Sequence, residues 1–438
     1  MKKRSLHLII ILIANMACGQ EFNLTVTGGF GTGIYNEGDT VHVWTKAIFS
    51  DSVFTQWSGS AVDHLTHSNE WHTTLYVPPG TGINNLELTA DYDVIPEESQ
   101  VGSSNYLLHG MDQGLEMDVQ KETFYAIPPT PKAMLFLLHG TGGRGENFFL
   151  RYERYSLIKD LIYNGYAVFT LDANEVTVGD QNGDEKLRWD STDPYNADVS
   201  NNVDVWNVSV LRDSVISEFM LPTDLPSYSL GMSAGAVFSD ICASALGFVA
   251  SAHITAKGSG FTYVRPDIAP VIWIMSDNDH QENADNATAF EHYTTMSGTQ
   301  EAEWHLLQRS PLYSKRFLRS LNNILPWQSD SLFHRLNNAG YLTADSFLTY
   351  LVLDSIPLEL LMSLGLNLDQ MGDVRQQLLC VNADHVQHAD YNKNIIRFFD
   401  QQLQALSVAD EESELPSFNV YPNPFQGRLT IDRSSGSI

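Results

Sequence analysis

The stretch YSLGMSAGAVFSD, residues 228–240, places Ser233 in a Gly-x-Ser-x-Gly pattern. The preceding residues favour a short strand, and AGAVFSDICASAL after it favours a helix. A serine on so sharp a turn has strained backbone angles, and side chains at Gly231 and Gly235 would clash with the strand and the helix. Because the pattern alone occurs by chance in about one chain in seven of this length, the rest of the sequence must decide whether Ser233 is a nucleophile.

A second Gly-rich turn lies upstream, in LFLLHGTGGRGE, residues 135–146. It follows an apolar strand, where esterases place a backbone N–H that binds the oxyanion. The first choice for this donor is Thr141 and the second is Gly142, while the N–H of Ala234 would be the other donor. His139 is expected to hold this turn rather than to act as a base.

The fold that uses such an elbow needs an acid and then a histidine downstream of the serine. After the apolar run APVIWIM, the segment SDNDHQ offers Asp277 and Asp279. After QQLLCVNA, read here as a strand, DHVQHAD offers His385 and His388. His385 is preferred because it is nearer the end of that run, and His388 stays an alternative.

Residues 106–405 alternate short apolar runs with longer amphipathic stretches. The runs AMLFLLHG, YAVFTLDA, APVIWIMSD, QQLLCVNAD and, more weakly, SAHITAKG read as buried strands, and NFFLRYERYSLIKDLIYNG reads as a helix. Strands that alternate with helices predict an α/β class with a doubly wound, mostly parallel sheet.

Residues 305–375 interrupt this alternation. SKRFLRSLNNIL, DSLFHRLNNAG, ADSFLTYLVL and PLELLMSLG are consecutive helical patterns with no strand between them. An insertion of roughly 70 residues is far longer than an ordinary connection. It is predicted to be helical, to precede the strand QQLLCVNAD, and to act as a lid over the pocket.

With these pieces in order, the chain from 106 to 405 resembles a secreted α/β-hydrolase of the poly(3-hydroxybutyrate) depolymerase-like and feruloyl or acetylxylan esterase-like group. LHGTGG, GMSAGA, DEKLRWD and DHVQHADYNKNIIRFF carry the likeness. The resemblance implies a serine carboxylic-ester hydrolase that needs no cofactor. It also favours Asp279 over Asp277, since the acid of this group follows a short turn after its strand. The catalytic residues would then be Ser233, Asp279 and His385.

The substrate stays open between a hydroxyalkanoate polyester, feruloyl or acetyl esters on plant polysaccharide, and lipid-like esters. Ala236 stands where a further glycine is common, and the long insertion is unusual for the group. A serine peptidase or acyltransferase on the same fold is one alternative function. A non-catalytic, glycan-binding surface protein is another.

The N-terminal segment, residues 1–19, reads as a signal peptide, with a basic start and a short apolar run. Cys18 leaves a lipoprotein signal as the alternative. Residues 20–95 read as an all-β module that resembles one unit of the bacterial β-repeats related to internalin B repeats. It would be a spacer or a glycan-binding module, with Trp44, Trp57 and Trp71 expected in its core. A linker is predicted over 96–105.

The C-terminal segment begins with an acidic linker, 406–415. Residues 416–438 contain VYPNPF, which resembles the start of the sorting domain of the type IX secretion system of Bacteroidetes, in a truncated copy. These features predict a secreted or cell-surface protein with the secretion machinery as a partner.

Composition excludes several other classes. The formal net charge of −28 repels nucleic acids and anionic lipids, and no segment after the signal region is long and apolar enough to span a membrane. Cys242 and Cys380 are expected as buried free thiols, although pairing stays possible. No zinc motif is present, and DQNGDEKLRWD, with Asp180, departs from a calcium loop in its spacing.

Overall fold

The computed structural model describes residues 20–414, except 193, 195–198, 261–262, 264–267, 282, 299–300, 350–361 and 363, and then 418–422 and 429–433. The chain forms two compact units. The smaller one contains residues up to Ile48 together with Phe54–Asp93, and the larger one contains Phe49–Val53 and everything from Val94 onward. The predicted signal peptide lies outside the described residues.

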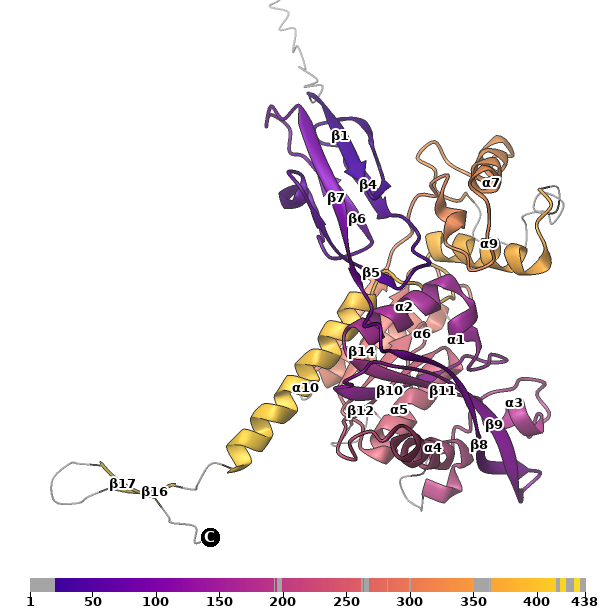
Figure 1. Ribbon diagram of the computed structural model, residues 1–438, viewed down its shortest axis with the longest axis vertical. Coiled ribbons are helices and arrows are strands. Elements are labelled where there is room, and N and C mark those ends of the chain that lie inside the picture. The colour runs from indigo at the N-terminus through magenta and orange to yellow at the C-terminus, as the bar shows by residue number, and fades with distance from the viewer. Residues whose placement is uncertain are drawn as a thin grey trace, which may run out of the picture. The chain divides into compact units, whose positions relative to one another are not determined.

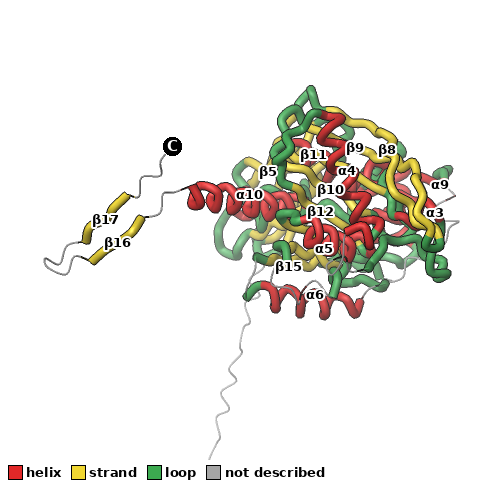
Figure 2. Tube along the Cα trace, turned by 90° about the horizontal axis from the view of Figure 1, so that it is seen from below, coloured by secondary structure: helices red, strands yellow, loops and turns green. Residues whose placement is uncertain are grey.

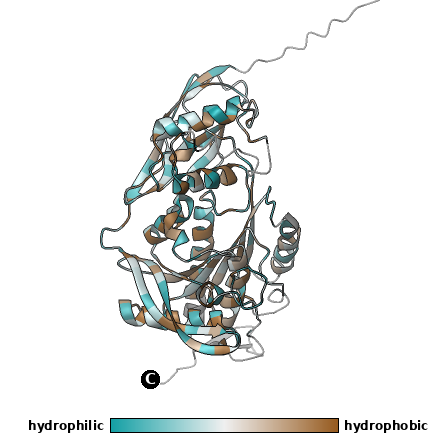
Figure 3. Cartoon of the chain, turned by 90° about the vertical axis from the view of Figure 1, so that its right-hand side faces the viewer, coloured by the Kyte–Doolittle hydropathy of each residue, from teal (hydrophilic) through white to brown (hydrophobic). Residues whose placement is uncertain are grey.

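The smaller unit is all-β, as its sequence indicates. One sheet has the order β3-β1-β7-β5 and the other has the order β2-β4-β6. These strands are β1 (Glu21–Thr27), β2 (Gly29–Phe30), β3 (Gly33–Asn36), β4 (Thr40–Thr45), β5 (Ser52–Ser58), β6 (His72–Tyr76) and β7 (Asn85–Val94). Apolar and polar side chains alternate along β1, and the apolar ones are buried. Figure 3, coloured by hydropathy, shows brown and teal mixed along the strands. Three tryptophans belong to its core: Trp44, Trp57 and Trp71.

The larger unit is built on an eight-stranded sheet with the order β15-β14-β13-β12-β10-β11-β9-β8 (Figure 1). From β10 to β15 neighbouring strands are parallel, whereas β9 is antiparallel to both of its neighbours. The strands are β8 (Gln100–Asp112), β9 (Leu115–Ile127), β10 (Ala133–Leu138), β11 (Tyr166–Leu171), β12 (Ser227–Met232), β13 (Ala250–Ile254), β14 (Val271–Ser276) and β15 (Ala302–Leu307). The α/β class with a doubly wound, mostly parallel sheet that the sequence predicts is confirmed.

Helices cover both faces of this sheet because its strands are apolar on both sides. In β10, Leu135 and Leu137 face the core formed with α2 (Tyr152–Tyr163) and α10 (Asn392–Glu414). Phe136 and Leu138 face the opposite core, formed with α4 (Val203–Phe219) and α5 (Ala234–Leu246). Figure 2 shows these strands in yellow between the red helices. The larger unit also contains two short helices, α1 (Asn147–Leu150) and α3 (Asn174–Val178), and the longer α6 (Asn283–Met296).

The segment QQLLCV is helical, so its prediction as a strand was wrong. It ends α9 (Leu368–Val381), which begins at a capping box made by Asn367 and Gln370. Met371, Val374 and Leu378 recur at helical spacing and are buried on one side. The last strand of the sheet is β15, which precedes the insertion, and His385 therefore follows a helix.

The insertion has a core of its own, to which α7 (Pro326–Asn338) and α9 contribute. Where SKRFLRSLNNIL predicts a helix, only one 3₁₀ turn forms, at Arg316–Leu318. The insertion begins after Leu307, where β15 ends, and includes α9, which ends at Val381. It therefore begins and ends later in the chain than the predicted range 305–375. Much of ADSFLTYLVL and PLELLMSLG lies outside the described residues.

Both predicted linkers contain regular structure. Residues 100–105 belong to β8, which pairs with β9 along its whole length and so satisfies its backbone groups. Residues 406–414 continue α10, as their alanine and glutamates favour. In the C-terminal segment where a sorting motif is predicted, β16 (Phe418–Pro422) and β17 (Leu429–Arg433) form an antiparallel hairpin. In the part of the chain the structure describes, no helix is both long and apolar enough to cross a lipid bilayer.

Candidate active site

Ser233 lies on the turn that joins β12 to α5. Its φ of 55° and ψ of −123° are strained for a residue with a side chain. A Cβ on Gly231 would lie 2.0 Å from the carbonyl oxygen of Gly235, and one on Gly235 would lie 2.2 Å from that of Leu138. Both flanking positions therefore need glycine, which leaves the half-buried Ser233 at the tip of the turn.

The Gly-rich turn after β10 lies beside this serine. A Cβ on Gly140 would be 3.3 Å from the Cβ of Ser233 and 3.9 Å from its Oγ. Thr141 follows at an exposed position. The N–H of Gly142 already donates to the carbonyl oxygen of Leu187 at 2.7 Å, which favours Thr141 as the oxyanion donor of this turn. Ala234, the other candidate donor, is the first residue of α5, where helix N–H groups have no partner within the helix.

His139 holds the turn from beneath. It is buried, its Nδ1 lies 2.8 Å from the Gly140 carbonyl oxygen, and its Nε2 accepts the N–H of Ala173 at 3.0 Å. The Trp189 indole N–H donates to the His139 carbonyl at 2.7 Å, and its ring stacks on Phe238 of α5. Burial lowers the pKa of His139 to about 4, so the ring is neutral at pH 7.

The predicted acid and histidine approach one another from two loops. Nδ1 of His385 lies 2.7 Å from Oδ2 of Asp279, and both side chains are almost fully buried. The alternatives lie elsewhere. Asp277 is exposed, with its N–H bonded to the Leu307 carbonyl, and the buried His388 faces Asp390 at 3.3 Å.

Asp384 is a site residue that the sequence analysis missed. Its buried carboxylate accepts the N–H of His385 at 2.7 Å and lies 3.2 Å from Nδ1 of His280. The N–H of Asn278 also donates to the Ala383 carbonyl. These contacts join the loop of the acid to the loop of the histidine. In the sequence, the only signal for Asp384 was its place directly before His385.

No family model matches this chain, and no characterised protein matches it by sequence. Solved structures that resemble it include a cold-adapted esterase from an Arctic intertidal metagenomic library, with 15% identity and a TM-score of 0.34, over 48% of this chain and 86% of that one. A dienelactone hydrolase from Anabaena variabilis has 14% identity and a TM-score of 0.33, over 48% and 87%. A ferulic acid esterase has 11% identity and a TM-score of 0.35, over 48% and 89%.

A buried ion pair joins the insertion to the sheet of the larger unit. Glu153 of α2 is fully buried and accepts from Arg319 at 2.6 and 2.8 Å, from Gln377 of α9 at 3.1 Å and from the N–H of Ala389 at 3.2 Å. Burial alone would raise the pKa of Glu153, but the guanidinium of Arg319 outweighs it and brings the pKa to about 2. Nothing in the spacing of these residues predicted the contact.

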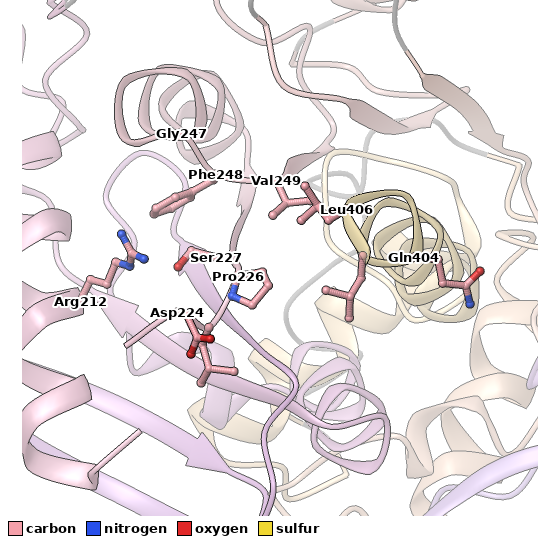
Figure 4. Close-up of a pocket in the computed structure, with 11 residues that line it drawn as sticks. Arg212, Asp224, Pro226, Ser227, Gly247, Phe248, Val249, Gln404 and Leu406 are labelled. Carbon is pink, nitrogen blue, oxygen red and sulfur yellow. The ribbon is translucent and has the colours of Figure 1, made fainter. Parts of the chain in front are cut away.

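Two pockets are lined by described residues. One, of about 490 Å³, opens where β12 begins, between Ser227, Phe248 and Leu406 of α10 (Figure 4). Because Ser227 and Ser233 lie at opposite ends of β12, this pocket is remote from the elbow. The other, of about 520 Å³, is lined by Asn174, Arg188 and Trp189, among others.

In the described part of the chain, the site has neither a metal-binding cluster nor a disulfide. Among the described residues, no group of three or more His, Cys, Asp or Glu side chains could hold a metal ion. The Asp180 carboxylate accepts N–H groups of its own loop, from Asn182, Gly183 and Glu185. Cys242 and Cys380 are both buried free thiols.

Proposed function

We propose that the chain is a serine carboxylic-ester hydrolase. The observation that carries the proposal is the backbone of Ser233, which is held at positive φ between a strand and a helix by glycines that tolerate no side chain. The closeness of Gly140 to Ser233 and the contact between Asp279 and His385 support it.

In this proposal the Ser233 hydroxyl attacks the ester carbonyl. His385 takes the hydroxyl proton and returns it to the leaving alcohol, while Asp279 orients the ring and stabilises its charged form. The N–H groups of Thr141 and Ala234 bind the oxyanion. Water then cleaves the acyl-serine, with His385 again as the base, and releases the acid.

The proposal extends to the substrate and location that the sequence suggests. The ester would belong to a polyester or a plant polysaccharide, and the protein would be secreted or held at the cell surface. The smaller β unit would contact glycan, and the C-terminal motif would engage the secretion machinery. The signal-like start and VYPNPF are the features that support export.

The test is the Ser233→Ala variant, assayed with p-nitrophenyl acetate and with a fluorophosphonate that labels active serines. We expect turnover and labelling to be lost, with an unchanged melting temperature. Ser227→Ala is the matched control, since its buried hydroxyl has no hydrogen-bond partner within the described structure. Activity retained by Ser233→Ala contradicts the proposal. Faster cleavage of peptide amides than of esters would instead favour a peptidase.

A further inference from the structure

Arg154 of α2 contacts Met232, the residue before the proposed nucleophile, and has no carboxylate partner among the described residues. Its Nη2 is 3.5 Å from Sδ of Met232, the residue before Ser233, and its guanidinium carbon lies 5.6 Å from the centre of the Phe148 ring. A thioether sulfur is a weak acceptor. Within the part of the chain that the structure describes, no acidic side chain lies within ion-pair distance of Arg154, and its buried Nε has no hydrogen-bond partner.

Neighbouring arginines of the same region are paired. Arg151, directly before α2 and three residues before Arg154, contacts Asp373 at 2.6 Å, and Arg319 contacts Glu153 at the same distance. The pairing matters because a charge that loses contact with water costs free energy unless an opposite charge compensates it. Arg154 is therefore an exception that the packing of the insertion does not explain.

The surroundings of Arg154 are those of the candidate active site. Burial lowers its pKa to about 10, with the Arg151 charge adding to the effect, so the guanidinium is still charged at pH 7. Its charge in turn contributes to the low pKa of His139, below the oxyanion turn. By its contacts, the guanidinium lies between Met232 at the end of β12 and Phe148 of α1, the helix that follows the Gly-rich turn.

The side chain is only half-buried, so solvent still reaches part of it. A planar guanidinium binds a carboxylate through two parallel hydrogen bonds. We propose that Arg154 binds a free carboxylate of the substrate and selects esters that carry one near the scissile bond. This inference rests on the proposed esterase function and specifies its substrate class.

The test compares each carboxylate ester with its neutral carboxamide. One set has the carboxylate on the acyl side, as in the monoethyl esters of succinate, glutarate, adipate and pimelate. The other has it on the alcohol side, as in acetyl esters of ω-hydroxy acids. We expect kcat/KM of the best carboxylate to exceed that of its carboxamide by about 10- to 100-fold, as hydrogen bonds to a charged group provide.

Arg154→Gln should lower kcat/KM for the carboxylate ester far more than for its carboxamide and so remove this preference, because the pairing with the carboxylate is lost. Arg154→Lys should retain part of it, since the charge is kept but the planar fork is not. Arg151→Met is the control one turn away, and it should lose stability through Asp373 without altering the preference.

Stability separates a binding role from a structural one. Arg154→Met removes an uncompensated charge, so we expect its melting temperature to be equal to or higher than that of the wild type. A lowered melting temperature with an unchanged preference would assign Arg154 to packing and overturn the inference. If the variants fail to fold, competitive inhibition of wild-type p-nitrophenyl acetate hydrolysis by adipate, but not by adipamide, still decides.

The remaining outcomes distinguish the two proposals. A wild type that hydrolyses neutral esters and shows no preference for any carboxylate overturns the role of Arg154 and leaves the esterase proposal intact. Inhibition by inorganic sulfate as strong as that by adipate overturns the assignment to a carboxylate. A protein that hydrolyses no ester and whose Ser233 is not labelled by the fluorophosphonate contradicts the proposed function itself.

Discussion

Nδ1 of His385 lies 2.7 Å from Oδ2 of Asp279, although 106 residues separate them in the chain. Most of the residues between them belong to the insertion. The contact therefore requires the loop of Asp279, before the insertion, and the loop of His385, after it, to lie at the same edge of the sheet. The Asp384 carboxylate, which accepts the N–H of His385, helps to hold the two loops there.

Asp279→Asn should keep the fold and lower kcat on the order of 10³-fold, because the amide no longer stabilises the charged His385. Steady-state kinetics with p-nitrophenyl acetate measure this loss. Asp277→Asn is the matched control two residues away, exposed and without the contact to His385. Equal losses in both variants would contradict the assignment of Asp279.

Gly235→Ala should abolish most activity and cost at least about 2 kcal/mol in the free energy of unfolding, since its methyl group overlaps the Leu138 carbonyl. Gly298→Ala is the control, because a Cβ there meets only the Thr295 carbonyl oxygen, at 3.9 Å. Its unfolding free energy should change by less than about 0.5 kcal/mol. Urea denaturation compares the two, and a tolerated Gly235→Ala would mean that the turn is wrongly described.

His139 should make the protein sensitive to acid. Its pKa of about 4 in the folded state lies below the ordinary value of 6.5, so the unfolded chain binds the proton more tightly. The stability this gives is complete above about pH 6.5 and is lost as the pH falls toward 4. Between about pH 7.5 and 4.5 the loss is about 2 to 3 kcal/mol.

His139→Asn keeps a donor for the Gly140 carbonyl but does not titrate. It should be less stable at neutral pH, because the Ala173 N–H loses its acceptor, and its unfolding free energy should fall less toward acid than that of the wild type. Urea unfolding at the two pH values measures the difference. Parallel pH profiles for the two proteins would show that His139 does not titrate in the unfolding transition.

Glu153→Gln should cost about 3 kcal/mol or more, because Arg319 remains buried with its charge uncompensated. Glu303→Gln offers a matched comparison: Glu303 also binds an arginine, Arg397, through two contacts, but at a partly exposed site. There we expect less than about 1 kcal/mol. Unfolding in urea distinguishes the two variants, and equal effects would show that burial does not govern the Glu153 pair.

The sequence predicted the features that depend on local chemistry. The strand and helix around Ser233 were identified because glycines and apolar periodicity leave few alternatives there. The run QQLLCV was misread because a short apolar stretch suits a buried strand as well as a buried helix. The capping pair Asn367 and Gln370, nine and six residues upstream, was the signal that could have decided it.

Contacts between distant segments were beyond this reasoning. Glu153 and Arg319 are 166 residues apart, and each looks like an ordinary surface charge in its own stretch of sequence. Arg154 was overlooked too, because the sequence does not reveal which charged side chains lack an oppositely charged partner in the fold. Residues 100–105 looked like a linker because they are mostly small and polar. They form a strand because they pair with residues of β9, which the local composition does not reveal.

The position of the insertion has a consequence for biosynthesis. Ser233 and Asp279 are translated well before the insertion, and His385 only after it. A chain interrupted within the insertion therefore carries the proposed nucleophile without its base. It also leaves Glu153 without Ala389, the backbone partner that comes last. Under the proposed mechanism, a nascent chain that has not yet reached His385 could not cleave an ester.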